Sequence, residues 1–342
     1  MKIIVDATGG DNAPEAIVNG ALDALEGSGV DIMLVGRGED ILRVIERRGL
    51  QVLPRNVEIV NATEIIGYDD DPATAVRIKK DSSLTVALNQ LRDGNGDALV
   101  SAGSTGALLS GATLIVKRVT GIRRAALAPV IPNSANGFVL IDCGANTECT
   151  AEYLLQFAYM GSFYAENVMH IDNPRVGLLN NGAERSKGAP LQLETFNLLE
   201  KAAAAGSLNF TGNVEAKDAI KGACDVLVAD GFSGNVLLKS LEGMASLIMS
   251  ELKVLFMKNA LTKLAALIMK KHIGELRKKM DADVVGGTAL LGITKPVIKA
   301  HGSSNAAAIS SAIRQAALTA GSGIASRLQS NMELMKVTDF ES

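Results

Sequence analysis

Clusters of Gly, Asp, Asn and Ser follow many of the short apolar runs of this chain. Two of them are DATGGD at residues 6–11 and DGFSGN at residues 230–235. Open α/β sheets bind ligands at the carboxyl ends of their strands, where small residues let backbone amides approach closely and a following helix offers unpaired N–H groups to phosphate. The pattern therefore predicts an anion site built on turns at the ends of strands.

The first turn, residues 6–11, could hold phosphate on the amides of Gly9 and Gly10, with a helix beginning near Pro14 behind them. Asp11 is kept as a candidate binding residue, although a carboxylate repels bare phosphate unless it binds a metal or orients a cation. The alternative is a structural turn in which Asp11 or Asn12 caps the helix.

The turn SAGSTGA at residues 101–107 is a better anion cradle, because it follows an apolar run, is rich in hydroxyls and contains no acid. We expect Ser104, Thr105 and Gly106 to hold phosphate there. A plain tight turn in which Ser104 or Thr105 caps a helix remains the alternative.

Four further strand-end turns supply candidate side chains and backbone amides. Lys187 could offset phosphate charge from a loop at residues 180–188, although a solvated charged loop is an equally common fate for such a run. His301 could serve as a base, a donor or a loop anchor. The turns contribute Asn146; Asn180 and Lys187; Asp230, Gly231, Ser233, Gly234 and Asn235; and Lys299, His301 and Ser303.

Several familiar reaction classes lack their motifs. The chain contains no G-x-S-x-G elbow for a serine hydrolase, no G-x-x-x-x-G-K-[ST] phosphate loop and no G-x-G-x-x-G after its first apolar run. Its three cysteines include no C-x-x-C pair, so neither a disulfide framework nor a zinc site is supported. We expect no cofactor, no metal and a reducing, cytoplasmic setting.

Nine short apolar runs separated by helical stretches predict the elements that carry these turns. Such runs are typical of a buried, mainly parallel sheet with helices on both faces, so the expected fold is doubly wound α/β/α. We expect one large domain over residues 1–330, a helical hairpin inserted at about 237–282 and a polar tail at 331–342. The runs are residues 3–5, 32–35, 57–60, 98–100, 138–141, 176–179, 208–210, 226–229 and 297–298.

The predicted hairpin, with its turn near Asn259, mixes many lysines with apolar side chains. Because lysines can sit at lipid headgroups while apolar residues enter the bilayer, its tip could contact a membrane through Leu255, Phe256, Met257 and Leu261. A hairpin in a dimer core is the alternative.

The net charge of −3 gives no general attraction for nucleic acid. Neither a signal peptide nor a long apolar run is present, so we expect a cytoplasmic, peripherally membrane-associated protein.

Six motifs in order resemble the PlsX family, the bacterial phosphate acyltransferases of phospholipid synthesis. The similarity extends from residue 1 to about 325, and its motifs are residues 6–11, 101–107, 142–146, 212–215, 230–235 and 299–304. One departure lies in the first turn, where many members have Met and His and this chain has Thr8 and Asn12. Asn12 cannot shuttle a proton.

The resemblance implies an enzyme that makes acyl phosphate from acyl-(acyl carrier protein) and inorganic phosphate, for glycerol-3-phosphate acylation. It also implies a cytosolic homodimer with a fold related to phosphotransacetylase and isocitrate or isopropylmalate dehydrogenase. The implied partners are acyl carrier protein, inorganic phosphate, a second copy, the membrane surface and the membrane-bound glycerol-3-phosphate acyltransferase.

Thioester phosphorolysis makes modest demands on these residues, because phosphate, with a second pKa of roughly 6, is itself the nucleophile at neutral pH. We therefore expect Lys187 or Lys299 to balance its charge, and Asn235 or His301 to donate to the thioester oxygen. A decarboxylating NAD-dependent dehydrogenase would need a metal held by clustered acids, and Asp225 and Asp230 support one poorly. A non-catalytic module that binds phosphate or acyl carrier protein is the other alternative.

Overall fold

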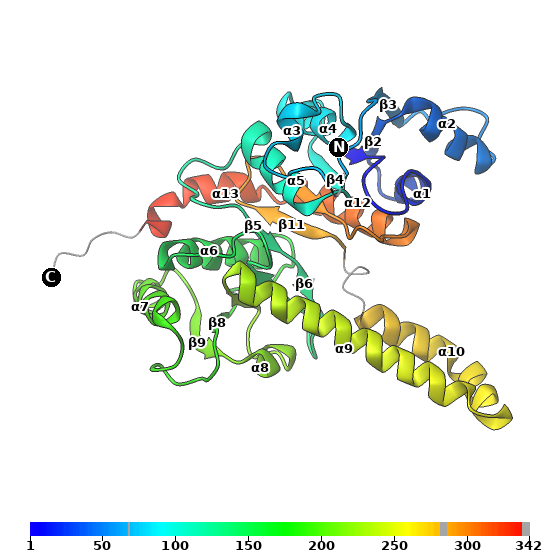
Figure 1. Cartoon of the computed structure of the whole chain (residues 1–342). Helices are drawn as coiled ribbons and strands as arrows, with labels where there is room; N and C mark the ends of the chain where they lie inside the picture. The colour runs from blue at the N-terminus through cyan, green and yellow to red at the C-terminus, as the bar shows by residue number, and fades with distance from the viewer. Residues whose placement is uncertain (68, 281–285, 337–342) are drawn as a thin grey trace.

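The structure is a computed structural model that describes residues 1–67, 69–280 and 286–336 (Figure 1). Its strands form two sheets. The seven-stranded sheet has the order β3-β2-β1-β4-β12-β11-β5. Its strands are β1 (Lys2–Asp6), β2 (Asp31–Gly36), β3 (Val57–Asn61), β4 (Ala98–Ser101), β5 (Ala126–Ala128), β11 (Thr288–Leu291) and β12 (Val297–Lys299).

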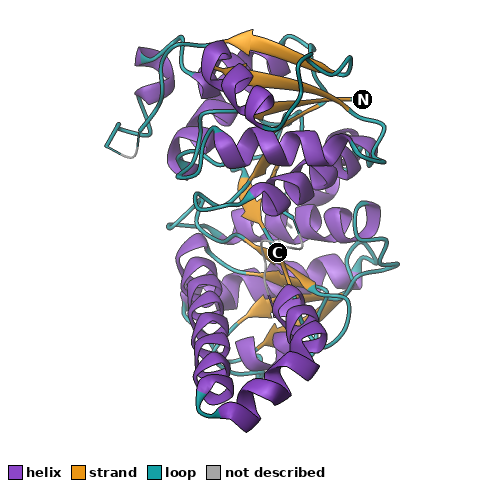
Figure 2. Ribbon diagram, turned by 90° about the vertical axis from the view of Figure 1, so that its right-hand side faces the viewer, coloured by secondary structure: helices purple, strands orange, loops and turns teal. Residues whose placement is uncertain are grey.

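The five-stranded sheet has the order β6-β7-β10-β8-β9. It contains β6 (Val130–Ile131), β7 (Phe138–Ile141), β8 (Val176–Leu179), β9 (Phe210–Val214) and β10 (Val226–Val228). Strands pair in parallel in both sheets except at β11, which is antiparallel to β12 and β5, and at β6, which is antiparallel to β7. Figure 2 shows the two sheets one above the other, with helices on both sides of each.

Helices cover the faces of both sheets, which explains why the strands are apolar throughout. Ile3, Ile4 and Val5 of β1, for example, are buried although they alternate between the two faces. The α-helices beside the sheets are α1 (Glu15–Leu25), α2 (Gly38–Arg47), α3 (Ala75–Ile78), α4 (Ser83–Arg92), α5 (Thr105–Gly111), α6 (Ala151–Asn167), α7 (Pro190–Ala204), α8 (Ala216–Ile220), α12 (Ala306–Gly321) and α13 (Ile324–Ser330). A π-helical turn, η1 (Ala112–Val116), continues α5, and a 3₁₀ turn, η2 (Met332–Met335), follows α13.

Helices α1 and α12 pack unusually closely because Gly20 has no side chain. A Cβ atom at Gly20 would lie 2.5 Å from the Ala306 carbonyl oxygen and 2.6 Å from Ile309 Cβ. Helix α12 is rich in alanine and follows the turn after β12, so this contact fixes that turn against the turn after β1.

The chain passes between the sheets at Pro129, which separates β5 from β6. The two edges are tied together by hydrogen bonds, since the Leu127 N–H donates to Asp142 Oδ1 at 2.9 Å and the Cys143 N–H donates to the Leu127 carbonyl at 3.2 Å. The chain returns to the first sheet before β11, by way of Gly286 and Gly287.

Two long helices extend away from both sheets as a hairpin (Figure 1). They are α9 (Gly231–Met257) and α10 (Ala260–Met280), which contact each other and turn at Asn259. The predicted hairpin is therefore confirmed, although α9 begins six residues before the expected start. Within the described residues, no helix is both long enough and apolar enough to cross a membrane.

The doubly wound α/β fold is confirmed, and the sequence prediction departs from the structure in four details. The strands divide between two sheets, and three of them, β5, β6 and β11, had not been predicted because they are short or contain ambiguous Ala-rich sequence. The run at 208–210 overlaps β9 (Phe210–Val214) only at Phe210. Part of the expected polar tail lies in the core, where Met332 and Met335 are buried, and residues 337–342 lie outside the described part.

Candidate functional site

Three turns meet at one edge of the seven-stranded sheet, because β1, β4 and β12 are adjacent and parallel. Asp6 organises the first of them from a buried position. Its carboxylate accepts hydrogen bonds from the hydroxyls of Ser83 (2.6 Å) and Ser101 (2.7 Å). Burial raises the pKa of Asp6, while those hydroxyls and the backbone N–H groups of Thr8 and Gly9 oppose the rise. Asp6 is thus a structural acceptor within the fold.

Glycines allow the three turns to lie against one another. Gly10 has φ +103°, and a Cβ atom there would lie 2.9 Å from Ala102 Cβ and 3.0 Å from the Gly302 carbonyl oxygen. The Asp11 N–H donates to that same carbonyl at 2.8 Å. Gly10 therefore allows the turn after β12 to lie close, and Gly9 does the same for the turn after β4, since a Cβ atom at Gly9 would lie 2.8 Å from the Gly103 backbone nitrogen.

Asn12 also contacts the turn after β12, and it does not cap a helix. Its side-chain amide donates to the carbonyl oxygens of Ser303 at 2.9 Å and Ser304 at 3.3 Å. The alternative in which Asn12 caps the first helix is wrong, since α1 has Pro14 at its N-cap and no side-chain cap. The Ser104 cap is confirmed, because its hydroxyl accepts the Ala107 N–H.

A second buried carboxylate, Asp142, organises the end of β7 in the five-stranded sheet. It accepts the N–H groups of Leu127, Ala145 and Asn146 and the side-chain amide of Asn146, at 2.7 to 3.2 Å. Burial raises its pKa, and these hydrogen bonds oppose the rise. Asn146 therefore supports the turn.

The start of α9 lies directly against this turn. A Cβ atom at Gly231 would lie 2.4 Å from the Asn146 carbonyl oxygen, and one at Gly234 would lie 1.9 Å from the Asp142 carbonyl oxygen. Both glycines are required by close packing. The Asp230 carboxylate caps the helix by accepting the Ser233 N–H at 2.9 Å.

A pocket of about 320 Å³ lies where the two sheets meet, and we call it the junction pocket. It brings together residues from both sheets and from α9. Its lining consists of Thr105, Leu127, Pro129, Val130, Cys143, Gly144, Asn235, Leu238, Lys239, Glu242, Gly286, Gly287, Thr288, Lys299 and His301. Both passages of the chain between the sheets contribute to it.

His301 lines this pocket with its ring orientation set by Ser303. The ring nitrogen Nδ1 accepts the Ser303 backbone N–H at 3.3 Å and lies 2.9 Å from the Ser303 hydroxyl oxygen. In the neutral ring the proton must then sit on Nε2, so His301 can donate a hydrogen bond from Nε2. Ser303 thus positions the imidazole.

Lysine and amide groups complete the polar side of the pocket. Lys299 is half-buried, and its ammonium donates to the carbonyl oxygens of Ala102 (3.4 Å) and Ala300. Asn235 lies beside Gly144. A Cβ atom added at Gly144 would lie 3.6 Å from the carbon of the Asn235 side-chain amide. One turn further along α9, Lys239 pairs with Glu242 at 2.7 Å.

Cys143 lines the pocket but is poorly suited to attack a thioester. Burial and the adjacent Asp142 carboxylate raise the pKa of its thiol, so the thiolate is scarce at neutral pH. The arrangement is suited to holding an anion and a carbonyl close together, and transfer through an acyl-cysteine is disfavoured.

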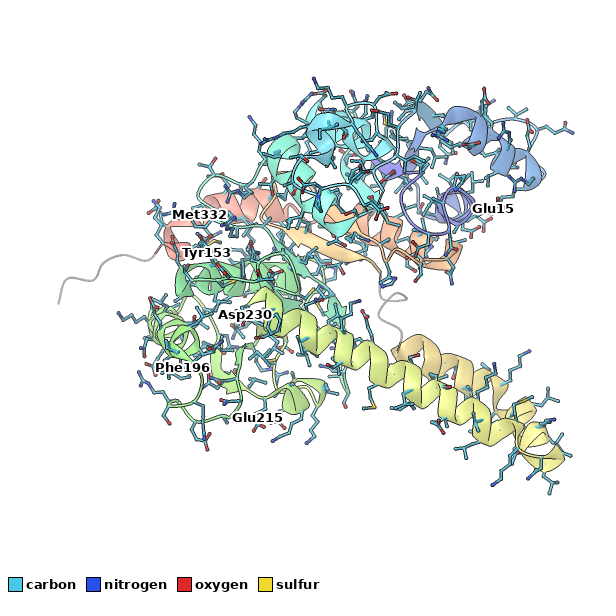
Figure 3. The ribbon with its side chains drawn as sticks, viewed as in Figure 1. Glu15, Tyr153, Phe196, Glu215, Asp230 and Met332 are labelled. Atoms are coloured by element: carbon cyan, nitrogen blue, oxygen red, sulfur yellow. The ribbon has the colours of Figure 1, made fainter. Side chains whose placement is uncertain are left out.

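A second hollow of about 330 Å³ lies at the ends of β8 and β10, and we call it the strand-end pocket. It includes three predicted residues, Asn180, Asp230 and Ser233. Lys187 lies in the exposed loop beside it, where its carbonyl accepts the Asn180 side-chain amide at 3.1 Å. Figure 3 shows Asp230 at the beginning of α9.

The predicted site residues therefore separate into three groups. Thr105, Asn235, Lys299 and His301 converge on the junction pocket. Asn180, Asp230 and Ser233 line the strand-end pocket, with Lys187 nearby. The others have structural contacts next to the junction pocket, and these are Gly9, Gly10, Asp11, Ser104, Gly106, Asn146, Gly231, Gly234 and Ser303.

Sequence reasoning missed the apolar wall and one charged pair. Leu127, Pro129 and Val130 come from strands too short to predict, and Gly286–Thr288 follow the hairpin without a recognisable motif. Lys239 could have been found, because it lies one helical turn beyond Asn235.

The acids invoked for a metal-dependent dehydrogenase are used elsewhere. Asp225 pairs with Arg175, whose Nε and Nη2 atoms lie 3.0 and 2.9 Å from its two carboxylate oxygens. Asp230 caps α9. Among the described residues, no three His, Cys, Asp or Glu side chains are grouped to hold a metal ion.

Comparisons with known proteins identify similar sequences and a similar fold. A family model described as "Fatty acid synthesis protein" matches residues 1–327. A phosphate acyltransferase of Thermoanaerobacter pseudethanolicus is 46% identical over 336 residues, covering 98% of both chains, and one of Brevibacillus brevis is 49% identical over 315 residues, covering 92% of both. A phosphotransacetylase from Streptococcus pyogenes superposes with a TM-score of 0.65 at 18% identity over 94% of both chains, which shows a shared fold.

Proposed function

Since the chain belongs to the fatty acid synthesis protein family and is similar to phosphate acyltransferases over nearly its whole length, we propose that it transfers an acyl group from acyl-(acyl carrier protein) to inorganic phosphate. The resemblance noted in the sequence and the assignment as an acyltransferase enzyme are thereby confirmed. The acyl phosphate product would supply phospholipid synthesis.

The reaction exchanges one acyl bond for another. A phosphate oxygen attacks the thioester carbonyl, the new C–O bond forms and the C–S bond breaks. The sulfur leaves on the carrier's prosthetic arm and takes up the proton from phosphate, giving free thiol and acyl phosphate. No redox step is involved, and a dianionic phosphate needs no strong base.

The junction pocket supplies groups for both reactants. Thr105 and Lys299 lie on the wall formed by the seven-stranded sheet and would bind phosphate. Asn235, from α9, and His301, through Nε2, would donate to the thioester oxygen as negative charge develops on it. Leu127, Pro129 and Leu238 would contact the carbon side of the substrate.

The observation that carries this assignment is the convergence of four predicted polar residues from distant parts of the sequence on one pocket. Thr105 and Asn235 are 130 positions apart in the sequence and belong to helices associated with different sheets. A site that holds phosphate in line with a carbonyl gains most of its rate from such positioning.

The test is release of free thiol from palmitoyl-(acyl carrier protein) with and without inorganic phosphate. We expect phosphate-dependent release, accompanied by an acid-labile acyl phosphate. Release without phosphate would indicate a thioesterase, and binding of both ligands without release would indicate a non-catalytic module.

Alanine variants of Lys299 and His301 test the residue roles. We expect each to lower kcat/KM by about 100-fold, because oxyanion donors and phosphate-binding cations act mainly in the transition state. His170→Ala, an exposed histidine in a distant turn, is the control. Turnover of both variants within a few-fold of the unaltered enzyme would refute the assignment.

The hairpin has the chemistry of a docking element, and we assign it two contacts. The exposed apolar side chains near its base, Met244, Leu247 and Ile248, fit a second copy of this chain in a homodimer. Leu255, Met257 and Leu261, at the tip, fit a lipid surface, where Lys253, Lys258 and Lys263 would face headgroups. Phe256 is half-buried, so it contributes less than predicted.

Tip contact would place the enzyme peripherally on the membrane from the cytoplasm, near the membrane-bound glycerol-3-phosphate acyltransferase that would use its product. An acyl phosphate is reactive in water, so a short path to the next enzyme limits its loss.

A further inference from the structure

The face of α9 that lines the junction pocket continues along the hairpin. Leu238, Lys239 and Glu242 follow Asn235 by three, four and seven positions, which places all four residues on one side of the helix. Further along the same side, half-buried residues recur with the same spacing while the side chains between them are exposed. They are Ala245, Met249, Leu252 and Phe256.

Helix α10 presents a matching row to this face. Thr262, Ala266 and Ile273 are half-buried among exposed neighbours. Counted outward from the turn at Asn259, Thr262 lies opposite Phe256, Ala266 opposite Leu252 and Ile273 opposite Ala245, as expected for two antiparallel helices in contact. We call the line between these two rows the hairpin seam.

On the α9 side, the seam begins at the junction pocket. Helix α9 leaves the pocket at Glu242, three residues before Ala245. The chain that follows α10 returns to the pocket at Gly286, Gly287 and Thr288. Beyond Glu242, the half-buried seam residues named above carry no charge.

The junction pocket is too small to hold the whole substrate. Its volume of about 320 Å³ is at the lower end of the range for small-ligand sites, and phosphate and the thioester must occupy part of it. A long acyl chain must therefore extend beyond the pocket along apolar surface.

The seam has the length that such a chain requires. From Glu242, where α9 leaves the pocket, to Leu252 the α-helical rise amounts to roughly 15 Å. The hydrocarbon core of a bilayer, about 30 Å thick, holds two acyl chains end to end, so one chain spans roughly 15 Å. We propose that the acyl chain of the substrate lies along the hairpin seam, with its thioester end in the junction pocket. This inference rests on the proposed acyl transfer and identifies its selectivity element.

Ala245 has the smallest side chain among the α9 residues of the seam, so a larger side chain there would fill space that the acyl chain needs. It lies about 10 Å along α9 from Leu238. A large side chain at Ala245 would stop a long acyl chain but leave room for a short one, so substrate length rather than catalysis would change.

The test compares Ala245→Trp with Ser246→Trp on two substrates. Ser246 is the adjacent residue, is exposed and lies about 100° around the helix, so its variant carries the same added bulk outside the seam. We expect Ala245→Trp to lower kcat/KM for palmitoyl-(acyl carrier protein) at least about tenfold, while octanoyl-(acyl carrier protein) changes less than about threefold. Ser246→Trp should change neither.

Undiminished palmitoyl turnover in Ala245→Trp, or an equal fall for both substrates, would overturn the seam as the acyl site. A failure of acyl transfer itself would show differently, as absence of phosphate-dependent turnover in the unaltered enzyme with either substrate.

Photolabelling provides a measurement that needs no variant. A palmitoyl-(acyl carrier protein) with a diazirine at the end of its chain should label peptides containing Leu252, Phe256 or Ala266. Adding phosphate should not prevent labelling of these peptides during the first turnover, because the acyl chain stays in place until the acyl phosphate product leaves. Labelling confined to the strand-end pocket, or to a partner subunit's outer hairpin face, would contradict the proposal.

Discussion

Asp6 and Asp142 are acidic residues beside a site that is proposed to bind an anion, and their hydrogen bonds explain how this is possible. Each carboxylate is buried and accepts hydrogen bonds from several donors, and for Asp142 one of them, the Leu127 N–H, comes from the other sheet. The negative charges are therefore used to shape the turns, and they lie behind the glycines rather than in the pocket. Sequence alone shows the acids but not the direction in which they face.

Asn12 offers a test of positioning at this scale. Loss of its two hydrogen bonds should loosen the turn that carries His301, so Asn12→Ala should lower kcat about fivefold to tenfold, consistent with about 1 kcal/mol for one or two hydrogen bonds. Asn12→Asp should be worse, because its carboxylate would face two carbonyl oxygens.

The experiment determines kcat and KM separately and records the midpoint of thermal unfolding in parallel. Asn19→Ala is the control, since Asn19 also donates to a backbone carbonyl but lies on the outside of α1. An Asn12→Ala enzyme with unchanged kcat would show that the tether is dispensable.

At the scale of elements, the start of α9 determines whether the two halves of the pocket fit together. Gly234 has no room for a methyl group, whereas Gly243, two and a half turns along the same helix, has no atom within 4 Å of an added Cβ. Alanine substitutions at these two glycines therefore measure the effect of close packing and the effect of helix propensity separately, within one helix.

We expect Gly234→Ala to destabilise the protein by about 3 kcal/mol or more, because α9 must move away from Asp142. Gly243→Ala should stabilise it by up to about 1 kcal/mol, since alanine is the better helix former. Urea unfolding followed by circular dichroism measures both. A Gly234→Ala protein as stable as the unaltered one would contradict the close packing.

The elements also show what the sequence could and could not predict. Runs of large apolar residues such as β1 and β7 can be recognised even at four or five residues, because both faces of each strand are buried. Of the strands at the sheet junction, β6 has only two residues, and β5 and β11 contain alanine, which is equally common in helices, so their sequences do not indicate a strand. The missed strands are those that join the sheets and wall the pocket.

At the scale of the whole molecule, strand-end turns at two sheet edges form different pockets. The prediction grouped all turns into one site, because sequence cannot tell which sheet a strand joins. Thr105 and Lys299 line the junction pocket from the side of the seven-stranded sheet, and Asn235 lines it because α9 crosses that region. Asn180 and Ser233 belong to the other edge.

The hairpin contacts are testable on the intact protein. Replacing Leu255, Met257 and Leu261 with Gln should abolish sedimentation with anionic liposomes, because the tip would lose its apolar anchor while keeping its lysines. Turnover of a carrier-bound substrate without liposomes should not change.

The control carries Val52→Gln and Ile78→Gln, two exposed apolar side chains on other elements. Light scattering during size-exclusion chromatography measures the oligomeric state, and we expect the tip variant to remain a dimer. Retained liposome binding would place the membrane contact elsewhere, and a monomeric tip variant would show that the tip itself joins the copies.

Both passages of the chain between the sheets line the junction pocket, one at Pro129 and the other at Gly286 and Gly287. During synthesis the first wall emerges from the ribosome long before the second, and Lys299 and His301 come later still. A nascent chain can therefore fold most of the five-stranded sheet and expose the whole hairpin while it has no complete pocket. The order of residues along the chain delays the capacity for acyl transfer until translation is nearly finished.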